Sequence, residues 1–417
     1  MLVSSTTPIR GAHIPRASTA LDTVTLGTFE ATPAARRYVD DVLTTGRLSY
    51  GPYSRRFERE FAAIHQCASA VVSSSGTAAL QVALQAMKEL DGWADGDEVI
   101  VPAVTFVATA NIVLHNNLRP VLVDVEPDFY GLAPAAFAAA ITPRTRAVIP
   151  VHLFGQPCDM TAIMAIARRH GLRVLEDSCE TMFARHAGRM CGSFGDAAAF
   201  STYIAHLIVT GVGGLTTTSD ADLAAVTRSL INHGRDGIYI SIDDTGSSRV
   251  EREMIVDRRF RFDRVGHSAR ITELEAALGV AALETWEEMV ATRRAHAAYL
   301  TARLSEVRDR IQIPARRPET DHSFMMFPLV LHHEPKRELV QHLESTGIET
   351  RDMLPILTQP VYRDGSLLDV TPGRHPTAEW IDRSGFYVDC HQGLSPEQLE
   401  HLADTIIAWC RTAPLGR

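Results

Sequence analysis

Short apolar segments alternate with helical stretches along most of the chain from Ala68 onward. The segments with the composition of strands are SAVVSS, DEVIVP, RPVLVDV, RAVIPVHL, RVLEDS, AAAFSTY and GGLTTTS, and stretches such as GTAALQVALQAM between them have helical apolar spacing. Strands separated by helices pair in parallel, because each helix returns the chain to the same end of the sheet. The pattern therefore predicts an α/β fold with a mostly parallel, seven-stranded sheet. In such folds, ligands sit at the carboxyl ends of the strands.

A chain of 417 residues is long enough for two domains. Residues 1–30 are rich in Ser, Thr and Pro and are expected to form an N-terminal arm. Residues 31–295 are expected to form a large domain that begins with two helices. Residues 296–417 are expected to form a smaller C-terminal α/β domain with a strand in FMMFPLVL.

Composition argues against several classes of partner. The net charge is −9 and no basic stripe is present, so nucleic acid is not expected as a partner. The first residues lack a secretion signal and no apolar run reaches the length of a membrane span, so a cytoplasmic protein without a membrane partner is expected. The six cysteines include no CxxC pair and the histidines no HExxH, so no metal site is expected.

Candidate ligand contacts follow four of the predicted strands. Gly76, in SSSGTAAL, opens a helix whose free N–H groups favour a phosphate, although Ser-Gly-Thr is also an ordinary helix cap. Asp177, in VLEDSCE, could pair with a protonated ring nitrogen or cap the next turn. Phe106, in VTFVATAN, could stack on a ring or belong to the core. Ser201 could reach a phosphate, and the GVGG at 211–214 permits a tight turn beneath a bound cofactor.

Together and in this order, these segments resemble the fold-type I pyridoxal phosphate enzymes, and more narrowly the sugar aminotransferases of the DegT–StrS type. The matching segments are SYGPYSRRFEREFA, TFVATAN, PVLVDVEPDFYGL, PVHLFGQPCDM, LEDSCE, SARITELEAALG and GFYVDCHQGLSPEQL. The resemblance implies an aminotransferase-like fold with a large and a small domain. It also implies a homodimer whose cofactor is pyridoxal 5'-phosphate or pyridoxamine 5'-phosphate.

The same resemblance implies how the phosphate of that cofactor would be held. The backbone near Gly76 and Thr77, together with Ser201, would bind it. Family dimers often send an asparagine from the partner subunit toward the phosphate, and Ser268 occupies the matching position here.

The resemblance also implies three contacts to the cofactor ring. Asp177 would pair with the ring nitrogen and Phe106 would stack on the ring. Glu180 occupies a position near the ring hydroxyl that is often filled by Gln or His.

One position departs from the aminotransferase pattern. In FSTYIAHLIVTGVGG the family usually has a lysine that holds the cofactor as an imine, and here the residue is His206. Of the 41 basic residues only Lys88 and Lys336 are lysines, and neither lies in a segment expected near the cofactor. Because an imidazole forms no stable imine, the cofactor is expected to be held without a covalent bond, as pyridoxamine phosphate.

A histidine here resembles the nucleotide-sugar 3-dehydratase branch of the family. The expected reaction is dehydration or deoxygenation at C3 of a nucleotide-linked keto-sugar, with His206 as general base. An amino donor such as glutamate would restore the amine. Some members of the branch hold an iron–sulfur cluster, and Cys179 lies in a comparable EDSC context. No cysteine occurs between Cys191 and Cys390, so no cluster is expected.

Two alternatives remain open. The protein could be a keto-sugar aminotransferase that uses His206 as a proton shuttle in place of the lysine. It could also be a catalytically silent, ligand-binding paralogue. The first differs from dehydration in one product, because transamination adds an amine whereas dehydration removes oxygen.

Overall fold

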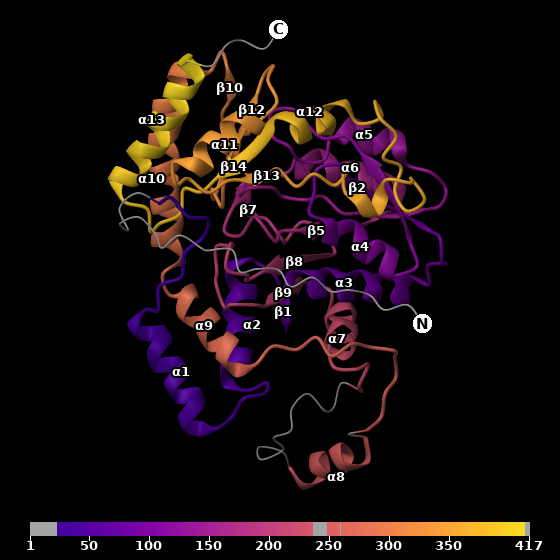
Figure 1. Cartoon of the computed structure of the whole chain (residues 1–417). Coiled ribbons are helices and arrows are strands. Elements are labelled where there is room, and N and C mark those ends of the chain that lie inside the picture. The colour runs from indigo at the N-terminus through magenta and orange to yellow at the C-terminus, as the bar shows by residue number, and fades with distance from the viewer. Residues whose placement is uncertain (1–22, 237–247, 259, 413–417) are drawn as a thin grey trace, which may run out of the picture.

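The structure, a computed structural model, describes residues 23–236, 248–258 and 260–412. Its centre is a seven-stranded sheet in the order β1-β9-β8-β5-β4-β2-β3 (Figure 1). The strands are β1 (Ser69–Ser73), β2 (Glu98–Pro102), β3 (Arg119–Val123), β4 (Thr145–Val148), β5 (Arg173–Asp177), β8 (Ala197–Ser201) and β9 (Gly214–Thr218). All are parallel except β9, which runs antiparallel to both of its neighbours. The predicted α/β fold is confirmed, and each predicted strand segment contributes one strand.

Helices cover both faces of this sheet. Successive strand residues point to opposite sides, so the apolar strands present apolar side chains on each face. On one face, Val71, Val99 and Leu175 pack in one core with the helices α3 (Gly76–Asp91), α4 (Val107–His115) and α7 (Ala221–Leu230). On the other face, Ile100 and Val174 pack with the helices α5 (Pro134–Ala140) and α6 (Met160–His170). Each such buried aliphatic side chain contributes about 1.5–3 kcal/mol to folding.

Three helices form a layer at one end of the sheet: α1 (Pro33–Thr45), α2 (Pro52–Ile64) and α9 (Glu273–Leu283). The buried carboxylate of Glu273 ties α9 to the start of α2, because it accepts hydrogen bonds from the N–H groups of Gly51, Tyr53 and Ser54 at 2.8–2.9 Å. A negative charge at a helix N-terminus is favourable in any case. The short helix α8 (Arg249–Arg258) lies at the far end of the molecule, beyond α7 (Figure 1).

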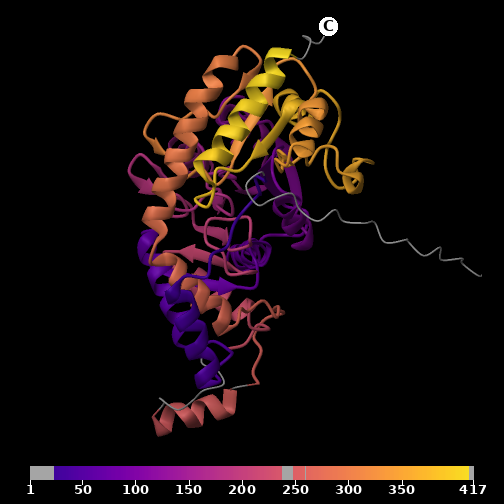
Figure 2. The ribbon, with the colours of Figure 1, turned by 60° about the vertical axis from the view of Figure 1, so that its left-hand side comes forward.

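The C-terminal part is built on a second, antiparallel sheet in the order β10-β12-β14-β13. Its strands are β10 (Ile311–Gln312), β12 (Phe327–Leu331), β13 (Arg351–Asp352) and β14 (Gly385–Val388), and its helices are α11 (Arg337–Ser345), α12 (Pro376–Ser384) and α13 (Pro396–Thr412). Helix α10 (Trp286–Leu304) lies beside α13 along one side of the molecule (Figure 2). The expected division at residue 295 therefore falls inside one continuous helix.

Smaller elements join the two parts. A three-stranded sheet in the order β11-β6-β7 pairs β11 (Thr320–Asp321) with β6 (Arg185–His186), which also pairs with β7 (Arg189–Met190). Two 3-10 helices span Ser305–Val307 and Pro360–Tyr362. Within the described residues, no helix combines the length and the apolar character needed to cross a bilayer. Residues 1–22 of the expected arm lie outside the described residues.

Candidate active site

The candidate residues gather at the carboxyl edge of the large sheet. Asp177 ends β5 beside Ala199 of β8, and Ser201 ends β8 opposite Gly214. Gly214 also faces Ser73 at the end of β1, so the turns that follow β1, β5 and β8 meet at one place. This is the edge at which the strand pattern predicts a ligand.

On one side of this site, the first turn of α3 lies very close to the end of β8. Ser75 caps α3, with its Oγ accepting a hydrogen bond from Ala78 N at 3.0 Å. Gly76 opens the helix, and a Cβ at this position would lie 2.6 Å from the Ser201 Cβ and 2.8 Å from the Cys179 Sγ. Only a glycine lets the first turn of α3 approach Ser201 this closely. The free N–H groups of that turn and the Ser201 hydroxyl suit a phosphate.

A buried carboxylate lies on the next strand. Asp177 is 4% exposed and accepts hydrogen bonds from Thr109 Oγ1 at 2.8 Å and from Cys179 N at 3.2 Å. Thr105 lies just before α4, four residues ahead of Thr109, with the two hydroxyl oxygens 2.7 Å apart. Burial raises the pKa of Asp177, and hydrogen bonds from Thr109 and Cys179 only partly oppose that effect. A cation at this carboxylate would remove the cost of burying its charge.

Glu180 lies one turn beyond Asp177. Its Oε2 accepts a hydrogen bond from Phe154 N at 3.0 Å, and Phe154 has a left-handed backbone with φ of 58°. Burial and, to a smaller extent, the nearby Asp177 raise the pKa of Glu180 and the Phe154 N–H lowers it, with a net rise to about 7. Glu180 is thus a carboxyl group that exchanges its proton near neutral pH.

The loop of residues 202–210 carries His206 between β8 and β9. Its base is closed by Thr202 and Thr210, whose hydroxyl oxygens are 2.6 Å apart and whose backbones are joined by a hydrogen bond of 2.9 Å. The buried Nδ1 of His206 has no hydrogen-bond partner among the described residues. Burial lowers the pKa of His206, and the backbone of Ser201 opposes this effect in part, with a net fall to about 4. The imidazole is therefore neutral at pH 7 and able to accept a proton.

Phe106, Thr77 and Ser268 present exposed side chains in this single chain. Phe106 precedes α4 and is 58% exposed, which leaves a face of its ring open to a ligand. Thr77 lies in the first turn of α3. Ser268 bridges to Asn232, and its neighbour Ala269 accepts a hydrogen bond from Ser74 N beside the start of α3. The role of Ser268 at the phosphate of a partner subunit stays a prediction.

Both lysines are engaged in contacts outside these turns. Lys88 lies near the end of α3, where its Nζ contacts Asp95 at 2.5 Å and donates to the Asn116 carbonyl at 2.7 Å. Lys336 directly precedes α11, where its Nζ contacts Asp352 at 2.8 Å and donates to the Asp382 carbonyl. Neither lysine belongs to the turns at the carboxyl edge of the large sheet.

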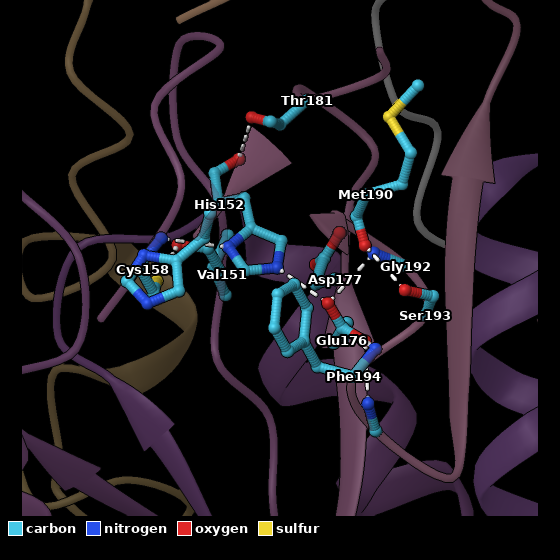
Figure 3. A network of polar contacts seen from close by, with 12 residues as sticks. Val151, His152, Cys158, Glu176, Asp177, Thr181, Met190, Gly192, Ser193 and Phe194 are labelled. Atoms are coloured by element: carbon cyan, nitrogen blue, oxygen red, sulfur yellow. Dashed lines mark hydrogen bonds and ion pairs between the residues drawn. The ribbon is translucent and has the colours of Figure 1, made fainter. Parts of the chain in front are cut away.

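Behind the site, a buried polar network fixes β5 to the following chain (Figure 3). The Glu176 carboxylate accepts hydrogen bonds from the N–H groups of Gly192, Phe194 and Gly195 at 2.7–2.8 Å and contacts His152 Nε2 at 3.0 Å. Burial lowers the pKa of His152, but Cys158 and Glu176 raise it more, to about 10. The Thr181 hydroxyl donates to the His152 carbonyl. The network thereby fixes both ends of the turn that carries Asp177 and Glu180.

Sequence reasoning missed the residues that orient these side chains. Thr109 lies in the matching segment TFVATAN, four residues after Thr105, and this pair of hydroxyl residues at the start of an expected helix is a usable signal. Neither Phe154 nor Glu176 could be recognised from the sequence. Phe154 acts through its backbone N–H, which leaves no mark on the residue type, and Glu176 has the appearance of an ordinary residue of a strand.

The residues present fit a pyridoxal-type cofactor. The glycine-lined approach of α3 to Ser201 suits its phosphate, and the costly buried carboxylate of Asp177 suits a protonated ring nitrogen. The unpaired Nδ1 of His206 completes the set, as a polar group without a partner in the described chain. No group of three or more His, Cys, Asp or Glu side chains suited to a metal occurs among the described residues.

Comparison with known proteins shows the family of this chain. The model of the DegT/DnrJ/EryC1/StrS aminotransferase family matches residues 31–407. The chain is 35% identical over 372 residues to the GDP-perosamine synthase of Caulobacter vibrioides, which covers 88% of this chain and 93% of that protein. It is 31% identical over 380 residues to the dTDP-4-dehydro-2,6-dideoxy-D-glucose 3-dehydratase of Saccharopolyspora spinosa, with 86% and 80% covered.

A solved structure extends the agreement to three dimensions. The crystal structure of S. venezuelae DesV in complex with a ketimine intermediate superimposes with a TM-score of 0.83 at 31% identity, and covers 94% of this chain and 100% of that one. The residues matched by the family model, 31–407, include the large sheet, the His206 loop and the C-terminal sheet. The chain belongs to the DegT/DnrJ/EryC1/StrS aminotransferase family.

Proposed function

We propose that this protein is a B6-dependent 3-dehydratase that acts on a nucleotide-linked keto-sugar and uses His206 to move protons. The observation that carries the proposal is the half-buried, neutral imidazole of His206, in the loop where the sequence resemblance places the family's lysine and in a chain whose two lysines are engaged elsewhere. The 31% identical relative from Saccharopolyspora spinosa, named as a sugar 3-dehydratase, supports it.

The cofactor is pyridoxal phosphate or its amine form, pyridoxamine phosphate. When bound, it supplies an amine that condenses with a ketone and a ring that withdraws electrons. The first turn of α3 and Ser201 would hold its phosphate, and Phe106 would stack on the ring. Asp177 would pair with the protonated ring nitrogen, and this pairing would lower the carboxyl pKa that burial raises.

His206 then performs the proton transfers. Its neutral imidazole would accept a proton from the cofactor carbon beside the ring and would donate it to the sugar hydroxyl that leaves as water. Glu180, with a pKa of about 7, donates a hydrogen bond to the ring hydroxyl when it is protonated. Glutamate or a similar amino donor restores the amine, no iron–sulfur cluster takes part, and the enzyme works in the cytoplasm as a homodimer.

Transamination of a keto-sugar is the second candidate. It is favoured by the 35% identical relative from Caulobacter vibrioides, named as a GDP-perosamine synthase. The same residues would serve, with His206 as the proton shuttle. Mass spectrometry separates the two reactions, because dehydration yields a product without the C3 oxygen and transamination yields an amino sugar.

Two substitutions at position 206 test the proposal. His206→Asn removes the base but keeps a polar group of similar size, so turnover should fall on the order of 10²–10⁴-fold. The dissociation constant for pyridoxamine phosphate should stay within a few-fold, because its other contacts remain. His206→Lys should give a visible absorbance band of covalently held pyridoxal phosphate that the wild type lacks.

A double variant, Lys88→Arg with Lys336→Arg, serves as the control. It keeps both ion pairs and should retain activity. Retained turnover in His206→Asn would remove His206 from the proton-transfer role. The lack of a band in His206→Lys would place residue 206 away from the cofactor.

A further inference from the structure

The segment of residues 23–28, the N-terminal strap, is bound to the C-terminal part of the molecule. Val24 is fully buried and is joined to Gly347 and Glu349 by two backbone hydrogen bonds of 2.9 Å. Leu26 N donates to Glu349 Oε2 at 2.9 Å, and Gly27 N donates to Asp389 Oδ2 at 2.7 Å. The strap is therefore held at three of its residues, Val24, Leu26 and Gly27.

The anchor for Gly27 is itself rigid. Asp389 is fully buried, and its Oδ1 lies 3.3 Å from Arg293 Nη1 and accepts a hydrogen bond from Cys390 N at 2.7 Å. Arg293, on α10, also donates to the Met325 carbonyl at 2.8 Å. A buried carboxylate with these partners fixes the position of the Gly27 amide.

The other side of Gly27 touches the loop that carries His206. Gly27 has a φ of 80°, and a Cβ at this position would lie 2.7 Å from the Ile204 carbonyl oxygen and 3.2 Å from the Ala205 Cα. Ala205 directly precedes His206. The loop tip is otherwise open, since Tyr203 is 53% exposed and Ile204 is 38% exposed.

We infer that Gly27 is a positioning residue for His206, and that the strap connects the C-terminal part of the molecule to the His206 loop. Thr202 and Thr210 close the base of the loop, whereas the tip packs against the backbone of Gly27. Glycine is required here for two reasons, the left-handed backbone and the lack of room for a Cβ. The inference rests on the proposed function, because it assigns a role to Gly27 through His206.

The experiment compares Gly27→Ala with Gly96→Ala. Gly96 has nearly the same backbone, with a φ of 83°, but a Cβ there meets nothing within 4 Å. Both substitutions carry the same backbone strain, and only Gly27→Ala pushes on the His206 loop. In the otherwise wild-type enzyme, Gly27→Ala should lower kcat on the order of 10²-fold, the cost of misplacing a reacting group by about 1 Å. The affinity for pyridoxamine phosphate should not change, because its contacts lie on other elements.

A second readout does not depend on turnover. In the His206→Lys background, Gly27→Ala should reduce the absorbance band of covalently held pyridoxal phosphate, and Gly96→Ala should leave it intact. A band that Gly27→Ala does not reduce, or equal kcat values for both alanine variants, overturns the positioning role and leaves the proposed function standing. The lack of a band in His206→Lys alone overturns the proposed function and the inference together.

A third variant serves if Gly27→Ala does not fold. Glu349→Ala removes the acceptor for Leu26 N without adding an atom, so it loosens the strap and should lower kcat several-fold. Glu349→Gln keeps an oxygen that can accept this hydrogen bond and should restore kcat. Equal values for the two Glu349 variants and the wild type would contradict the inference.

Discussion

Glu176 and Asp177 are neighbours on β5, yet their carboxylates have different surroundings. They point to opposite sides of the strand and are almost equally buried, at 0% and 4% exposure. Glu176 accepts hydrogen bonds from three backbone N–H groups and contacts His152. Asp177 is held by the Thr109 hydroxyl and, at a longer distance, by Cys179 N.

The difference shows how a buried carboxylate can be assigned to structure or to ligand binding. A carboxylate offers about four acceptor sites, and those of Glu176 are supplied by the protein itself. Burial raises the pKa of Asp177 despite its two donors, so its charge is under-compensated until a cation arrives. The buried fraction is nearly the same for the two side chains and does not distinguish their roles. The number of hydrogen-bond donors around each carboxylate does.

The largest expected effect comes from removing the structural member of the pair. Glu176→Ala leaves three N–H groups and His152 without their acceptor and should lower the free energy of unfolding by about 3–5 kcal/mol. Urea denaturation of the cofactor-free protein measures it. The control is Asp95→Ala, which breaks only the exposed pair with Lys88 and should cost no more than about 1 kcal/mol. Equal losses in the two variants would contradict the structural role of Glu176.

Asp177→Asn is expected to have a smaller effect of the opposite kind, because it should weaken cofactor binding without lowering the stability of the cofactor-free protein. Because the folded pKa of Asp177 is raised, the stability that this carboxyl contributes at low pH is lost as pH rises through that pKa. The amide has no charge to bury, so the cofactor-free variant should be as stable as the wild type at pH 7, or more stable. Its affinity for pyridoxamine phosphate should fall by about 1.5–3 kcal/mol, the value of a hydrogen bond to a charged group.

Titration of the cofactor into both proteins, with thermal unfolding at each step, separates the two effects. Ligand binding to the folded state raises the apparent stability in proportion to affinity. An Asp177→Asn protein that is destabilised without cofactor and still binds the cofactor normally would show that Asp177 has a structural role and no role in binding.

The sequence predicted the sheet well because its signals are local. Each strand is a short apolar run followed by a turn, and the glycine and aspartate that follow such runs lie where parallel strands must end. The contrast between Glu176 and Asp177 could not be predicted in this way. The donors to Glu176 come from residues 192–195, whose N–H groups carry no side-chain signature and become neighbours only after β8 pairs with β5.

The histidine at position 206 illustrates the same limit. Its identity was readable in FSTYIAHLIVTGVGG, but its neutral state was not, because that state follows from burial. The strap that touches its loop lies some 180 residues earlier in the chain. Contacts over such separations depend on the assembled fold.

The smallest effect is expected at Glu180, which is intermediate between Glu176 and Asp177 and accepts a hydrogen bond from Phe154 N. Burial raises its pKa to about 7, so its contribution to stability is complete below the ordinary value of about 4.5 and is lost as pH rises to about 7. Asp177 and Tyr387 face it and keep their own titrations in both proteins compared. Glu180→Gln should remove this loss, with a slope change of at most about 1.4 kcal/mol per pH unit in the unfolding free energy. Urea denaturation of the cofactor-free protein at pH 5 to 8 measures it. Parallel pH curves for wild type and Glu180→Gln would show that Glu180 keeps its charge throughout, as a carboxylate supplied with donors in the manner of Glu176.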